Sequence, residues 1–124
     1  MAEPSGSLID NYRQAVSAQP ASAEAYSNLG WGYYGQRNYS EAVKAFEYAL
    51  SLDRSYLDAH YGLGLAHKEA GDKAAALAAF EATVKLAEQL DNAVRGHMLV
   101  RLAQGHLNQI ESGSWGLDSL GSAG

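Results

Sequence analysis

The sequence repeats itself at an offset of 34 residues, and this period constrains the fold more than any other feature. Eight residues between positions 25 and 52 recur in one register between positions 59 and 86; in the first copy they are Ala25, Leu29, Gly30, Ala42, Ala45, Phe46, Glu47 and Leu52. The same shift places Tyr12 under Phe46, so half a unit precedes the first full one. Downstream the match weakens, and His97 and Met98 stand where the earlier units have Leu and Gly. We therefore predict two full units, a half unit before them and a divergent unit after them.

Within each unit the apolar residues follow helical spacing. They recur at steps of three and four positions, as in Val43, Phe46 and Leu50, and again in Leu77, Phe80 and Val84. Ser40 and Asp72 are the N-caps that we predict for the second helix of each unit. Gly71 supplies the turn before Asp72, whereas Arg37 and Asn38 must form the equivalent turn without glycine. The pattern predicts an all-α fold with helices near residues 6–19, 23–36, 41–53, 57–70, 74–87 and 91–111.

The 34-residue unit resembles the tetratricopeptide repeat, a helix–turn–helix motif whose copies stack into a superhelix. The family's series of aromatic, Leu-Gly, aromatic, Ala, aromatic and Ala reads in the first unit as Tyr26, Leu29, Gly30, Tyr33, Ala42, Phe46 and Ala49. In the second unit it reads as His60, Leu63, Gly64, His67, Ala76, Phe80 and Thr83. The family's proline near the end of the unit survives only as Pro20. The resemblance implies a right-handed tetratricopeptide superhelix, an α-solenoid of about six helices.

The period also divides the chain. We predict a single repeat domain over residues 1–112, made of a half repeat at 6–22, repeats at 23–56 and 57–90, and a divergent third unit or capping helix at 91–112. Residues 113–124 are rich in Gly and Ser, which is typical of a flexible tail. That segment also contains Trp115, Leu117 and Leu120, so two alternatives stay open: the tail fills a groove as a placeholder ligand, or these apolar residues have no role.

Composition excludes several classes of partner. The net charge is −5, and no stretch of Lys and Arg forms the basic face that nucleic acid or an anionic membrane requires. The absence of cysteine removes disulfides, thiolate metal sites and a cysteine nucleophile. The start of the chain lacks the pattern of a secretory signal, and no run of about 18 apolar residues occurs. We expect a cytoplasmic location by default, without membrane insertion.

In tetratricopeptide proteins the first helices of successive units line a concave surface that binds an extended peptide or a helix. The resemblance assigns to this surface Glu24, Ser27, Trp31, Tyr34, Asp58, Tyr61, Leu65, Lys68, Asn92, Arg95, Leu99 and Leu102. Large rings bury much area at a modest entropic cost, so Trp31, Tyr34 and Tyr61 are the predicted anchors for an apolar partner segment. The alternative is that these rings only pack against neighbouring helices.

Few residues suggest metal binding, pH sensitivity or a ligand site. His60, His67 and His97 occupy positions where the repeat places packing residues, so we interpret them as core histidines, with a metal site and a pH-sensitive core as lesser alternatives. Gly32 and Gly35 are not required by the repeat. They reflect either sequence drift or close contact with the preceding helix, or they clear space for a ligand beside Trp31 and Tyr34.

The sequence contains no catalytic constellation and implies no cofactor. It predicts a non-enzymatic module that binds a peptide or helix of a protein partner on an aromatic concave groove. Two alternatives remain: self-assembly into homo-oligomers through residues 8–19 or the tail, and an accessory domain of a larger protein.

Overall fold

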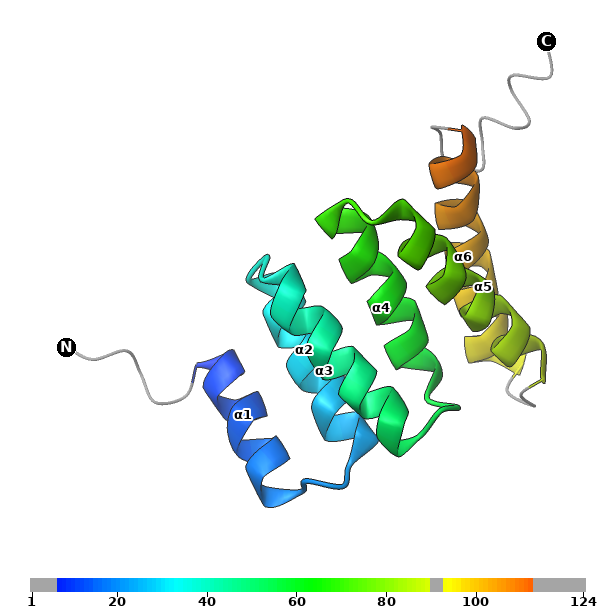
Figure 1. Ribbon diagram of the computed structural model, residues 1–124. Coiled ribbons are helices and arrows are strands. Elements are labelled where there is room, and N and C mark those ends of the chain that lie inside the picture. Colours follow the sequence, from blue (N-terminus) through cyan, green and yellow to red (C-terminus); the bar gives the residue numbers. More distant parts are fainter. Residues whose placement is uncertain (1–6, 90–92, 113–124) are drawn as a thin grey trace, which may run out of the picture.

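The computed structural model describes residues 7–89 and 93–112 of the chain, without the side chains of residues 93–99, 111 and 112. Over these residues the protein is an all-α helical repeat solenoid (Figure 1). Its helices are α1 (Leu8–Ala18), α2 (Ala23–Gly35), α3 (Tyr39–Leu52), α4 (Leu57–Ala70), α5 (Lys73–Gln89) and α6 (Ala93–Ser112). Each helix packs against the next one along the chain, and α2 also packs against α4. Figure 1 shows the result, an elongated row that runs from α1 at one end to α5 and α6 at the other.

The predicted helices and the observed ones agree within a few residues, and the differences lie at the ends. Helix α3 begins at Tyr39 because the side chain of Asn38 accepts a hydrogen bond from the Glu41 backbone N–H, at 3.4 Å. The prediction that Ser40 is the N-cap is therefore wrong, since Ser40 lies inside the first turn. The prediction for Asp72 is confirmed, because its carboxylate accepts from the Ala75 N–H at 3.1 Å.

The two turns inside the full units share one backbone conformation although they differ in sequence. Gly71 has φ of 92° and follows the last residue of α4. Arg37 lies 34 residues earlier and has φ of 62°, in the left-handed region that favours glycine. The turn of the first unit therefore contains no glycine. Arg37 adopts there the left-handed conformation that Gly71 adopts in the second unit.

Phe46 of α3 holds the two full units together. Its ring is 0 % exposed, and it lies against two glycines that come from different helices. A Cβ atom added to Gly30 of α2 would come within 2.7 Å of the ring, and one added to Gly62 of α4 would come closer still. Gly64 accommodates Phe80 of α5 in the same way. The absence of a side chain at these positions lets the helices approach each other across the aromatic ring.

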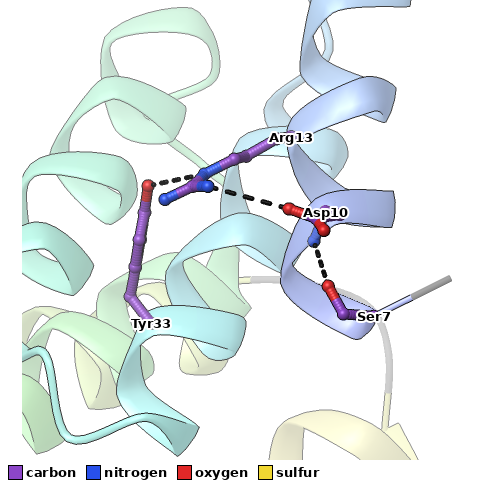
Figure 2. A network of polar contacts seen from close by, with 4 residues as sticks. All are labelled: Ser7, Asp10, Arg13 and Tyr33. Atoms are coloured by element: carbon purple, nitrogen blue, oxygen red, sulfur yellow. Dashed lines mark hydrogen bonds and ion pairs between the residues drawn. The ribbon is translucent and has the colours of Figure 1, made fainter. Parts of the chain in front are cut away.

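The half unit is anchored on α2 by packing and by a small polar network. Gly32 lies against Tyr12 and Ile9 of α1, and a Cβ atom there would come within 2.7 Å of the Tyr12 ring. Figure 2 shows the polar part, in which Arg13 Nε donates to the Tyr33 hydroxyl at 3.4 Å and pairs with Asp10 at 3.7 Å. Gly32 therefore packs against the preceding helix, which is one of the interpretations made from the sequence.

No helix in the described parts of the chain combines the length and the apolar character that crossing a membrane requires.

Candidate partner-binding face

Three aromatic side chains form a continuous row across α2 and α4. The Trp31 ring meets Tyr34 edge to face, with centroids 5.9 Å apart, and lies 6.4 Å from the ring of Tyr61. Tyr34 in turn contacts Tyr39 at the start of α3, at 5.5 Å. We call Tyr34, Trp31 and Tyr61 the aromatic row. It brings together the three rings that the sequence predicted as anchors.

Each ring of the aromatic row is partly buried, because one side of it rests on the core. Trp31 packs edge to face on Phe46 at 5.1 Å, and Tyr61 lies 5.9 Å from Phe80. Burial raises the pKa of Tyr61 above its ordinary value, and it also raises the pKa of Tyr34, to which the nearby charge of Glu69 adds. The sequence allowed two interpretations of these rings, packing against neighbouring helices and binding of a partner. The two are compatible, because a ring that packs on the core with one side can contact a partner with the other.

A polar cluster joins α4 to α6 at the end of the aromatic row. Lys68 Nζ lies 3.0 Å from His106 Nδ1 and also donates to Gln109 Oε1, while His106 Nε2 lies 3.2 Å from the Tyr61 hydroxyl. The His106 ring stacks on Phe80 with centroids 4.9 Å apart and planes 6° from parallel. We call Tyr61, Lys68, His106 and Gln109 the polar cluster.

The polar cluster sets the tautomer of His106. An ammonium group can only donate, so Lys68 assigns the acceptor role to Nδ1 and leaves the proton on Nε2, from which it is donated to the Tyr61 hydroxyl. Burial, followed by the positive charge of Lys68, lowers the pKa of His106 from 6.5 to about 4. A second proton on this ring would point at Lys68, so the neutral form holds the cluster together.

We expect the stability of the protein to decrease as the pH falls from about 6.5 to about 4. The reason is that the unfolded chain protonates His106 near its ordinary pKa, whereas the folded protein resists protonation until the lower value is reached. Urea titrations at several pH values would measure this slope, and His106→Gln should flatten it. In the matched variant His67→Gln the slope should persist; an unchanged slope in His106→Gln would contradict the assignment.

Sequence reasoning missed His106, although a signal for it was available. The positions assigned to the concave surface of the last helix end at Leu102, and one further step of four residues reaches His106. The pH-sensitive core was assigned to other histidines. Among them, His60 bonds through Nε2 to the Arg54 carbonyl oxygen at 2.9 Å, and the side chain of His97 lies outside the described residues. Within the described parts of the chain, no group of three metal-ligating side chains was found.

The other predicted binding residues have different environments. Glu24 is exposed, and Leu65 and Lys68 are partly buried on α4. Ser27 is only 1 % exposed, and its hydroxyl has no hydrogen-bond partner among the described residues, so the expectation that it faces an open groove is wrong. Its short side chain lies one helical turn from the larger Trp31 and does not extend to the surface. Arg95 and Leu99 are on α6, but their side chains lie outside the description.

These features define a class of protein: an α-helical repeat solenoid whose first helices carry an aromatic and polar face. The family model described as tetratricopeptide repeat matches residues 28–91, which is more than half of the chain. The chain belongs to the tetratricopeptide repeat family. Members of this family are typically non-catalytic modules for interaction between proteins.

Curated relatives share the repeat. BBSome complex member BBS4 of Xenopus tropicalis is 31 % identical over 104 residues, which cover 84 % of this chain and 20 % of that protein. Small glutamine-rich tetratricopeptide repeat-containing protein 2 of Saccharomyces cerevisiae is 33 % identical over 73 residues, 59 % of this chain and 21 % of that protein. The chain thus spans about a fifth of the length of these relatives.

The fold is also found in a solved structure. The crystal structure of MamA superposes with a TM-score of 0.62 at 27 % sequence identity, over 83 % of this chain and 60 % of that one.

Proposed function

We propose that the chain binds a peptide or a helix of a protein partner along the aromatic row. The observation that carries this proposal is continuity: three partly buried rings lie in contact across two helices. Rings that the core already holds lose little side-chain entropy when a partner covers them, so their burial contributes fully to binding. By the repeat register we assign to the same surface Leu65, the 36 % exposed Leu102 and the exposed Glu24. The repeat register adds Arg95 and Leu99 to the proposed surface.

A pull-down from cell lysate with the immobilised chain tests the proposal. Tyr34→Ala and Trp31→Ala should each weaken capture of the partner by more than about tenfold, which is the usual effect of removing an aromatic hot spot. The matched control is Tyr48→Ala, because Tyr48 is a 46 % exposed tyrosine on α3, outside the aromatic row. Circular dichroism must show that all variants remain helical. Capture that survives both row variants, or is lost equally in the control, would contradict the proposal.

A second candidate is self-association, and one observation favours it. Leu8 of α1 is 61 % exposed at the end of the helical row, where α1 packs against α2. Sedimentation equilibrium over a range of concentrations would reveal such association, and Leu8→Asp should abolish it. A protein that stays monomeric at high concentration would eliminate this candidate.

A further inference from the structure

A series of contacts links the aromatic row to the polar cluster. The Tyr61 ring of α4 lies 6.4 Å from the Trp31 ring of α2 and 5.8 Å from the His106 ring of α6, measured between centroids. Lys68 follows Tyr61 by about two helical turns and reaches the other nitrogen atom of the same imidazole. The contacts therefore extend from α2 across α4 to α6, and they place the Tyr61 hydroxyl and the Lys68 ammonium group on either side of His106.

The two groups beside His106 each retain a hydrogen-bond donor. The Lys68 ammonium group has three N–H bonds, and two of them serve His106 Nδ1 and Gln109 Oε1. The Tyr61 oxygen accepts from His106 Nε2, so the hydroxyl proton remains for donation. Burial raises the pKa of Tyr61, which keeps this proton in place at neutral pH. Among the described residues, neither the third N–H of Lys68 nor the O–H of Tyr61 has an acceptor.

Lys68 also retains its positive charge. Its two acceptors are a neutral imidazole and an amide, which hold the ammonium group in place without cancelling its charge. The ion pairs in the described parts of the chain lie within α1 and within α3, away from Lys68. Because the side chains of Lys68 and Tyr61 are only partly buried, a bound segment can contact both of them. A carboxylate matches this pair of donors, since it has two acceptor oxygens and a negative charge.

We infer that the partner segment carries an Asp or Glu side chain whose carboxylate accepts hydrogen bonds from Lys68 and from Tyr61. This inference rests on the proposed function, because it names the chemistry of the segment bound there. An apolar residue beside the acidic one would cover the rings of Tyr61 and Trp31. The face continues from α4 to α2 on one side and to α6 on the other, so a segment that crosses it extends in both directions. The carboxylate therefore belongs to a side chain and not to the end of the partner chain.

Selection of random peptides displayed on phage, against the immobilised full chain, tests the inference. The enriched peptides should carry an Asp or Glu beside apolar residues, and they should require Trp31 for binding. Exchange of the acidic residue for Asn or Gln in the synthetic peptide should weaken binding about tenfold, because a charged hydrogen bond becomes a neutral one. Amidation of the C-terminus of the peptide should leave its affinity unchanged.

A double-mutant cycle assigns the carboxylate to its donors on the protein. Lys68→Met should weaken binding of the acidic peptide about tenfold and should remove most of the difference between the acidic peptide and its amide version. Tyr61→Phe keeps the ring and removes only the hydroxyl, so it should weaken binding of the acidic peptide about three- to fivefold. The matched controls are Lys85→Met and Tyr48→Phe, because both residues are exposed, on α5 and α3. These controls should leave binding unchanged.

The possible failures are distinguishable. Peptides that require Trp31 but carry no acidic residue, or that lose the same factor on exchange of acid for amide in Lys68→Met as in the wild type, would overturn the inference and leave the proposed function standing. Loss of binding on amidation would place a chain end at Lys68 and would also overturn it. If no enriched peptide requires Trp31 or Tyr34, the proposed function fails and the inference fails with it. Tyr61→Phe leaves the contacts of Lys68 with α6 in place, so it keeps the test decisive even where Lys68→Met loosens α6.

Discussion

Replacement of Phe46 by alanine is expected to lower the free energy of unfolding by about 3–5 kcal/mol. The ring is fully buried between α2 and α4, and the glycines that face it have no side chains with which to fill the space it would leave. A loss of this size is a large share of the 5–15 kcal/mol typical of a small domain. Urea denaturation followed by circular dichroism would measure it.

The control for this variant lies on the same helix. Tyr48→Ala removes a ring of similar size that is 46 % exposed and pairs with Tyr26 at 4.3 Å, so it should cost about 1 kcal/mol or less. If Phe46→Ala proved no more destabilising than Tyr48→Ala, Phe46 would not be the ring that holds the units together.

The second large effect concerns a glycine whose replacement by alanine should destabilise the protein. Alanine in place of glycine inside a helix ordinarily stabilises it by about 1 kcal/mol. At Gly62 the added methyl group would collide with the Phe46 ring, and overpacking of this kind costs about 1–3 kcal/mol. Gly62→Ala should therefore lower the midpoint of urea denaturation.

Gly35 provides the comparison for Gly62, since nothing lies within 4 Å of a Cβ atom added there. Gly35→Ala should leave the stability unchanged or raise it by up to about 1 kcal/mol. Effects of the same sign at both glycines would show that the close contact with Phe46 does not control the outcome.

Much of the fold was predictable because the same pattern occurs twice. Two copies of Leu-Gly and of the central phenylalanine set the register, so that the helices could be placed within a few residues. Gly30 and Gly64 occupy the same position of the repeat. In the structure both glycines face a phenylalanine ring. The cap of α3 was misplaced because Asn38 and Ser40 are both good N-cap residues, and only the backbone decides between them.

The candidate surface was harder to predict because the repeat pattern does not determine which side chains reach it. Spacing assigned Ser27 to the same helical face as Trp31, but spacing carries no information on which side chain is long enough to reach the surface. His106 was missed because the face predicted for the last helix ended at Leu102, and because its contacts with Tyr61 and Lys68 join residues about 40 positions apart.

The way Phe46 is enclosed has a consequence for how the protein unfolds. The first unit encodes the ring, but Gly62 of the second unit completes the wall around it. Without α4 one side of the ring would meet water, and exposure of a side chain of this size costs about 1.5–3 kcal/mol. Neither unit is therefore complete by itself. The two should melt together in a single cooperative transition, because the boundary of the repeat in the sequence does not coincide with a weak point in the packing.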